Sequence, residues 1–117
     1  MILGAGVSIS SGLRAYRDPS GNNYYNVDMD PEELLHVTCL EDIDKRERMF
    51  AFYEPLYDNI QEVTTPGPCY DKLKVYAQDA CIVTQNIDGL AVKAFSDVTK
   101  HIVEIHGNSE FFVCMTC

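Results

Sequence analysis

A short apolar run followed at once by polar side chains is the feature that most constrains the fold of this chain. Residues 80–83, Ala-Cys-Ile-Val, are apolar and β-branched at their end, as in a central strand of a parallel sheet. The next residues, Thr-Gln-Asn-Ile-Asp-Gly-Leu, place Gln85, Asn86 and Asp88 just beyond that strand. Ligands of doubly wound α/β sheets bind at the carboxyl ends of the strands. The pattern therefore predicts an α/β fold with a binding site here.

A purely structural interpretation competes with this one. In it, residues 84–90 form an ordinary strand-to-helix turn, and Asp88 caps the N-terminus of the following helix. This segment alone does not decide between the two interpretations, so other parts of the chain have to be considered.

A glycine-rich segment near the N-terminus is a second candidate binding element. Residues 1–3, Met-Ile-Leu, have the pattern of a strand end, and Gly4-Ala5-Gly6-Val7-Ser8 follows. Glycines let backbone N–H groups approach a diphosphate closely, and the guanidinium of Arg17 suits phosphate oxygens. The segment is not the ordinary dinucleotide fingerprint, because Ile9 stands where a third glycine would be needed.

A histidine at the end of another predicted strand is the third candidate. Residues 102–105, Ile-Val-Glu-Ile, read as a strand, and His106-Gly107 follows. Imidazole suits proton transfer near neutral pH, although a single histidine is more often structural.

Together these motifs resemble the sirtuins, the NAD-dependent protein lysine deacylases. The resemblance covers nearly the whole chain and keeps the family's order of motifs. It implies an α/β fold with a partial Rossmann-like parallel sheet, helices and the start of a small zinc-binding module. The matching segments are Gly4-Ala5-Gly6-Val7-Ser8 with Ser11-Gly12-Leu13 and Tyr16-Arg17, Thr84-Gln85-Asn86-Ile87-Asp88-Gly89-Leu90, His106-Gly107, and Cys114-Met115-Thr116-Cys117.

The resemblance implies an enzyme that uses NAD to remove an acyl group from lysine, releasing nicotinamide and forming O-acyl-ADP-ribose. The implied catalytic residues are His106, as general base toward a ribose hydroxyl, and Asn86, which would position the ribose or a water. Asp88 would accept a hydrogen bond from the nicotinamide carboxamide. The full set of implied NAD-binding residues is Gly4, Ala5, Gly6, Ser8, Tyr16, Arg17, Gln85, Asn86, Ile87, Asp88 and His106.

Two positions depart from the family's pattern. Most sirtuins read Gly-Ile-Pro-Asp-Phe-Arg where residues 12–17 read Gly-Leu-Arg-Ala-Tyr-Arg, so Ala15 cannot supply the acidic side chain. Members that remove succinyl or malonyl groups carry Tyr-x-x-Arg on a small-domain helix. When Tyr53 is aligned with that tyrosine, Leu56 stands at the position of the arginine. We therefore expect a deacetylase rather than a desuccinylase.

The length of 117 residues predicts a fragment, because a sirtuin catalytic core is roughly two typical domains' worth of sequence. We expect these residues alone to be inactive. A catalytically inert remnant that binds NAD, ADP-ribose or a protein partner is the alternative. The expected segments are 1–26 (glycine-rich NAD-binding turn and cofactor loop), 27–79 (mainly helical), 80–108 (central strands with Gln-Asn-Ile-Asp and the histidine) and 109–117 (first half of the zinc module).

The cysteines indicate metal binding rather than disulfides. Cys114 and Cys117 have half the ligand spacing of a structural zinc site, which needs four ligands. A thioredoxin-like redox pair is the competing interpretation, but such motifs open a helix. The other three cysteines show no framework spacing and indicate reduced thiols in an intracellular compartment, the nucleus or the cytoplasm.

Charge and hydropathy exclude two classes of partner. Eighteen acidic residues against nine basic ones give a formal net charge of −9, which argues against direct nucleic-acid binding. No apolar run approaches the ~20 residues of a membrane span, so we expect no membrane association. The expected partner is an acyl-lysine protein, with histones as one candidate class.

Helix signals fill the region between the glycine-rich turn and the central strand. Asp30-Pro31-Glu32-Glu33 is a typical helix start, and a longer helix is expected from about Asp44 to Asn59. Pro55 should bend or break that helix. A short amphipathic helix is expected over residues 70–78. The apolar positions of the long helix that we expect in the core are Met49, Phe50, Tyr53, Leu56, Tyr57 and Ile60.

Overall fold

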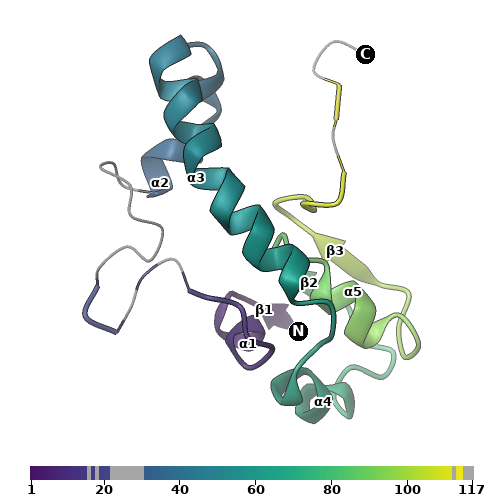
Figure 1. Ribbon diagram of the computed structural model, residues 1–117. Coiled ribbons are helices and arrows are strands. Elements are labelled where there is room, and N and C mark those ends of the chain that lie inside the picture. Colours follow the sequence, from purple (N-terminus) through teal and green to yellow (C-terminus); the bar gives the residue numbers. More distant parts are fainter. Residues whose placement is uncertain (16, 18, 22–30, 112, 115–117) are drawn as a thin grey trace. The chain divides into compact units, whose positions relative to one another are not determined.

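The computed structural model describes residues 1–15, 17, 19–21, 31–111 and 113–114. The chain divides into two compact units, one of residues 1–13 and 63–117 and the other of residues 14–62. The first unit contains the sheet and the second contains the longest helix (Figure 1).

The first unit is built on a parallel sheet of three strands in the order β1-β2-β3. These are β1 (Ile2–Leu3), β2 (Ile82–Thr84) and β3 (Ile102–Glu104). Val83 of β2 pairs with Ile2 on one side and Val103 on the other. The predicted α/β fold class is confirmed, and so is the central position of the apolar run, although β2 begins only at Ile82.

Burial differs between the central strand and its neighbour at the edge. Ile82 and Thr84 of β2 are fully buried, whereas Val103 of β3 is 47 % exposed. β2 is paired on both sides, and hydrogen bonds from Val83 N–H to the Met1 carbonyl and from Ile82 N–H to the His101 carbonyl extend the ladder. Because the strands are parallel, their carboxyl ends all meet at one edge of the sheet.

Three short helices accompany this sheet: α1 (Gly6–Ile9), α4 (Pro68–Lys74) and α5 (Leu90–Phe95). Tyr70 of α4 and Phe95 of α5 are both buried, and their ring centroids lie 5.7 Å apart. α4 ends four residues before the predicted end at residue 78. Its last turn closes with a hydrogen bond from Tyr76 N–H to the Leu73 carbonyl, and the Tyr76 side chain is 75 % exposed, so no packing extends the helix.

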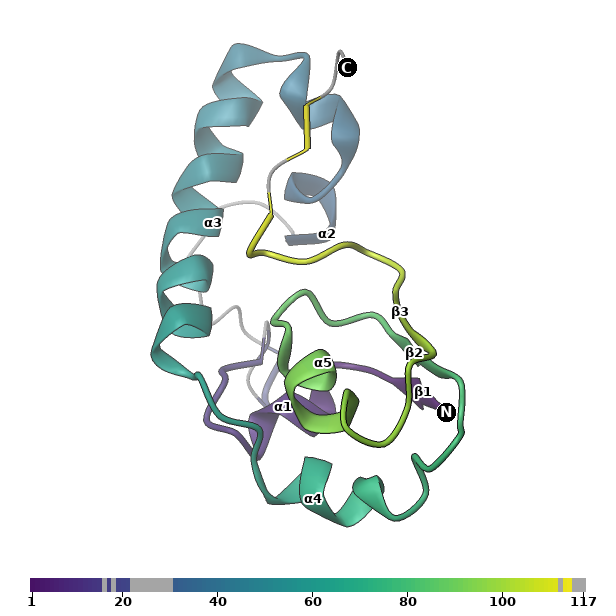
Figure 2. The ribbon, with the colours of Figure 1, turned by 90° about the vertical axis from the view of Figure 1, so that its right-hand side faces the viewer.

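The second unit consists of α2 (Pro31–Leu34), a 3-10 helix (Val37–Leu40) and α3 (Ile43–Glu62). The first two lie beside α3 (Figures 1 and 2). The long helix and the helix start at Pro31 were both predicted, whereas Asp30 lies outside the described residues. No helix in the described part of the chain has the length and apolar character that a bilayer span requires.

The structure does not support a break of α3 at Pro55 or burial of Phe50 and Tyr57. The helix is not broken at Pro55, because one missing N–H donor is tolerated in a helix whose buried stripe continues on both sides, at Phe52 and Leu56. Phe50 and Tyr57 are 59 % and 43 % exposed. The buried positions form a single stripe at helical spacing, consisting of Met49, Phe52, Leu56 and Ile60.

A close backbone contact at Gly67 joins the segment before α4 to the turn after α1. Gly67 N–H donates to Ser11 Oγ at 2.7 Å, and Cys69 N–H donates to Ser10 Oγ at 3.1 Å. A Cβ atom added at Gly67 would lie 2.3 Å from the Ser10 carbonyl oxygen. The contact therefore leaves no room for any side chain at residue 67.

We expect Gly67→Ala to lower the free energy of unfolding by about 1–3 kcal/mol, the usual effect of overpacking. Thermal unfolding followed by circular dichroism would measure it. Gly6→Ala is the matched control, because a Cβ there meets no atom within 4 Å and the residue lies in a helix. An equal Tm for the two variants would contradict the contact described.

Candidate functional site

Three loops meet at the edge of the sheet where the strands end. Gln85 N–H donates to the Leu3 carbonyl at 3.0 Å, and Ile105 N–H donates to the Thr84 carbonyl at 3.0 Å. Farther out, Ser109 N–H donates to the Ile87 carbonyl at 2.8 Å. These bonds bring the predicted residues after β1, β2 and β3 into one region.

Ser8 is the centre of a buried hydrogen-bond network in this region. Its Oγ donates to Asp88 Oδ2 at 2.6 Å and lies 2.9 Å from the Tyr70 hydroxyl and 3.0 Å from Asn86 Nδ2. All four side chains are at most 8 % exposed. A serine hydroxyl has one proton and two lone pairs. Since the proton goes to Asp88, Tyr70 and Asn86 must both donate to Ser8, and its hydrogen-bonding capacity is filled.

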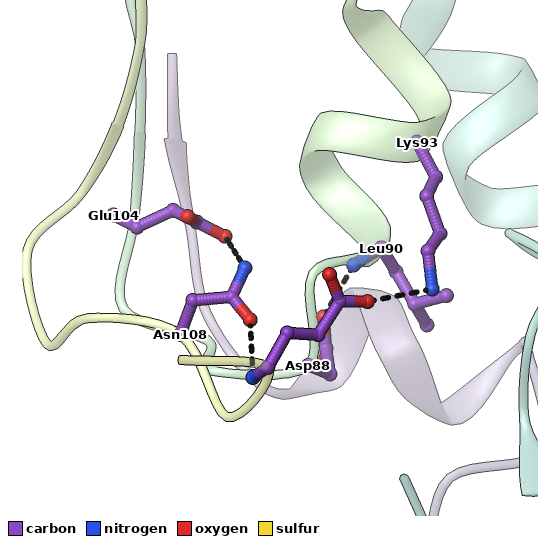
Figure 3. A network of polar contacts seen from close by, with 6 residues as sticks. Asp88, Leu90, Lys93, Glu104 and Asn108 are labelled. Carbon is purple, nitrogen blue, oxygen red and sulfur yellow. Dashed lines mark hydrogen bonds and ion pairs between the residues drawn. The ribbon is translucent and has the colours of Figure 1, made fainter. Parts of the chain in front are cut away.

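Asp88 does not occupy the N-cap position of α5 that the structural interpretation gave it, because Gly89 is the N-cap. Its Oδ1 accepts the N–H of Leu90 at 2.9 Å, so the carboxylate does bond the first residue of α5 (Figure 3). Gly89, between them, has a φ of 70°, a conformation that favours glycine. Each carboxylate oxygen offers two lone pairs, so one remains on each oxygen for a further donor. The structural role therefore does not exclude a binding role.

Asn86 links the end of β1 to α1. Its Nδ2 donates to the Gly4 carbonyl at 3.2 Å as well as to Ser8 Oγ. Its backbone N–H donates to Thr84 Oγ1 at 3.1 Å. The side chain is 8 % exposed and fixed by bonds to two different segments.

The remaining predicted residues of this unit lie at the surface. Gly4, Ala5, Gly6, Gln85 and His106 are all exposed, and Ile87 is half-buried. A Cβ atom at Gly4 or Gly6 would meet no protein atom within 4 Å. The glycine-rich turn thus presents open backbone next to the buried network.

A second polar network fixes the loop after His106 (Figure 3). Asn108 Nδ2 donates to Glu104 Oε1 at 2.8 Å, and Asn108 Oδ1 accepts the N–H of Glu110 at 2.9 Å. The Glu110 carboxylate lies 3.2 Å from Lys93 Nζ of α5. Sequence reasoning missed these residues, because single Glu, Asn and Lys residues are common on protein surfaces and only the fold brings these four together.

The described structure does not test the remaining predicted site residues. Arg17 belongs to the second unit and is exposed, and its Nη1 lies 3.5 Å from the Gly21 carbonyl. Tyr16 and Cys117 lie outside the described residues, and Cys114 is exposed. Among the residues that the structure describes, no three His, Cys, Asp or Glu side chains gather as metal ligands. The zinc site stays a prediction.

Sequence reasoning also missed Tyr70. It lies on α4 at a position that reads as the apolar face of an amphipathic helix, and no sequence signal marks its hydroxyl. In the structure it is 1 % exposed and bonds Ser8. Burial is the main cause that raises the pKa of Tyr70 to about 12.

Comparison with known proteins agrees with the motifs. The model of the Sir2 family matches residues 4–117. The chain is 37 % identical over 119 residues to an NAD-dependent protein deacetylase of Listeria monocytogenes, covering 99 % of this chain and 48 % of the relative. It is 36 % identical over 118 residues to one of Enterococcus faecalis, covering 99 % and 46 %. The chain spans about half the length of these curated relatives. No solved structure gives a significant match.

The raised pKa of Tyr70 predicts a pH dependence of stability. The pKa of an unfolded tyrosine is near 10.0, and burial raises the pKa of folded Tyr70 to about 12. Between these values the unfolded chain releases its proton first, so the free energy of unfolding should fall as the pH rises from about 10 to about 12.

Urea unfolding at several pH values would measure this slope. Tyr70→Phe should flatten it, whereas Tyr76→Phe, which removes a hydroxyl from an exposed side chain of the same unit, should leave it in place. A slope that is the same in both variants would show that Tyr70 does not cause it.

Proposed function

The chain belongs to the Sir2 family, and on that premise we propose that it supplies the NAD-binding and catalytic residues of an NAD-dependent protein lysine deacylase. The observation that carries the proposal is the buried placement of Asn86 and Asp88 at the carboxyl end of the central strand, next to an open glycine turn. The relatives described above are named NAD-dependent protein deacetylases, which supports both the cofactor and a protein substrate.

The described residues fit a dinucleotide of this kind. When bound, NAD supplies the ribose carbon to which the acyl oxygen is transferred and nicotinamide as the leaving group. Gly4 and Gly6 leave their backbone open, so a diphosphate can approach without meeting a side chain. The lone pairs that remain on Asp88 suit the N–H donors of a carboxamide. Asn86, held by Ser8 and Gly4, would orient the ribose or a water.

His106 is the proposed general base. It follows β3 at the same edge of the sheet as Asn86 and is exposed, so it can take a proton from a hydroxyl of a bound ligand and release it to water. Exposed Gln85 would bond the ribose hydroxyls beside it. In this proposal, buried groups orient the bound ligand, and exposed groups transfer protons or bond its hydroxyls.

We also propose that Cys114 and Cys117 supply two of the four ligands of a structural zinc. The other two would come from the part of the family's catalytic core that this chain does not span. Two thiolates alone hold zinc weakly, so we expect residues 1–117 by themselves to bind little zinc and to lack activity.

The role of His106 can be tested in a protein that carries these residues within a complete Sir2 catalytic core, called here the complete-core protein. His106→Ala should lower deacylation of an acyl-lysine peptide by about 10²–10⁴-fold, as loss of a general base does. Chromatographic detection of O-acyl-ADP-ribose and nicotinamide would measure it. His101→Ala is the matched control, because His101 lies at the opposite end of β3. Undiminished turnover in His106→Ala would contradict the assignment.

We further propose a preference for uncharged acyl groups. When Tyr53 is aligned with the tyrosine of succinyl-removing members, Leu56 stands at the position of their arginine. Leu56 lies on α3, and its side chain is 6 % exposed. An acyl carboxylate buried without a cation is strongly unfavourable.

The complete-core protein should therefore show a kcat/KM for an acetyl-lysine peptide at least about tenfold higher than for the succinyl-lysine peptide of the same sequence, which corresponds to a difference of about 1.4 kcal/mol. The two peptides differ only in the acyl group and control for sequence effects. Equal or faster removal of succinyl would show that Leu56 does not occupy the position of the family's arginine.

A further inference from the structure

We propose that Tyr70 is a positioning residue of this site, because its hydroxyl holds the Ser8 hydroxyl against the carboxylate of Asp88. The catalytic consequence rests on the proposed function, since it requires that Asp88 receive the nicotinamide group. The positional consequence does not, because it concerns bonds within the chain alone.

The first step of the argument is the assignment of protons around Ser8. Ser8 donates its only proton to Asp88 Oδ2 at 2.6 Å. The Tyr70 hydroxyl, 2.9 Å from Ser8 Oγ, must therefore be the donor in that pair. Asn86 Nδ2 donates to Ser8 Oγ and so uses its second lone pair. The direction of the Tyr70 bond thus follows from the hydrogen bonds around it.

The second step is the rigidity of Tyr70. Its side chain is 1 % exposed, and its ring packs on Phe95 with centroids 5.7 Å apart. A phenol ring has only two side-chain torsions, and here the packing of α4 on α5 fixes both. The packing of the ring therefore fixes the position of the hydroxyl that contacts Ser8. Ser8 itself lies in the four-residue helix α1, which by itself offers little rigidity.

The third step concerns what Ser8 does to Asp88. A hydroxyl that accepts a hydrogen bond becomes a better donor, so the proton from Tyr70 strengthens the short bond from Ser8 to Asp88. Asp88 is then held from both oxygens, by Ser8 at Oδ2 and by the Leu90 N–H at Oδ1. These two bonds fix the orientation of the carboxylate, as a binding carboxylate requires.

Tyr70 can act this way over a wide pH range. Burial raises its pKa to about 12, so the hydroxyl keeps its proton under any physiological condition. The same carboxylate, Asp88, contributes to that increase by disfavouring a second negative charge nearby. The negative charge of Asp88 therefore favours the neutral form of Tyr70, which can donate a hydrogen bond.

The competing interpretation is that Tyr70 only fills the core between α4 and α5. Tyr70→Phe separates the two interpretations, because it keeps the ring and removes the hydroxyl alone. Ser8→Ala removes the group through which Tyr70 would act. If Tyr70 acts through Ser8, the effect of Tyr70→Phe should disappear in the Ser8→Ala background. Tyr76→Phe is the control, since its side chain is 75 % exposed in the same unit.

The first measurement is the proton chemical shift of the Leu90 amide, which shares the Asp88 carboxylate with Ser8. We expect both Tyr70→Phe and Ser8→Ala to move this resonance in the 117-residue chain, the double variant to match Ser8→Ala, and Tyr76→Phe to leave it unchanged. An unmoved Leu90 resonance in Tyr70→Phe would overturn the proposal, and so would additive shifts in the double variant. Loss of folding in Tyr70→Phe would also overturn it, because the hydroxyl would then be a structural requirement.

The second measurement is kcat/KM for NAD in the complete-core protein. Loss of one net hydrogen bond predicts a fall of about five- to tenfold in Tyr70→Phe, with kcat/KM within about twofold of the Ser8→Ala value in the double variant. Equal falls in both backgrounds would overturn the proposal. Absence of turnover in the parent protein would count against the proposed function only, because the Leu90 resonance still decides the role of Tyr70.

Discussion

The hydrogen bond from the Ser8 hydroxyl to the Asp88 carboxylate is the contact on which the sheet-containing unit depends. It joins two residues 80 positions apart and connects α1 to the start of α5. A carboxylate that is only 6 % exposed is strongly unfavourable unless its oxygens are bonded. Ser8 and Leu90 provide one bond each, and Tyr70 and Asn86 fix Ser8. Loss of any member leaves a buried polar group without its partner, so the stability of the network depends on all four side chains.

The parallel sheet places this network at the edge where the proposed ligand would bind. Parallel strands end at one edge, where the polar residues after β1, β2 and β3 converge. The buried members, Asn86 and Asp88, have little freedom, whereas exposed Gln85 and His106 remain accessible. Groups that orient a ligand benefit from rigidity, and groups that exchange protons need access to solvent. The fold supplies both within a few residues of the central strand.

Packing explains why the structure differs from the expectations about α3. A proline normally ends a helix, yet α3 continues through Pro55 because Phe52 and Leu56 are buried on either side of it. Phe50 and Tyr57 are apolar and were expected in the core, but the buried stripe of α3 passes through other positions. Helical spacing identifies candidate faces, and only the neighbouring elements decide which face is covered.

The sequence by itself determined the strands, the polar residues that follow them and the family, because each of these depends on a local pattern. A β-branched run such as Ile82-Val83 predicts a strand, and Asn86 and Asp88 stand out because they follow it directly. The tertiary structure alone decided that Ser8 bonds Asp88 and that Tyr70 donates to Ser8. Those pairs are separated by 80 and 62 residues, and no local pattern encodes the distance between side chains that only folding brings together.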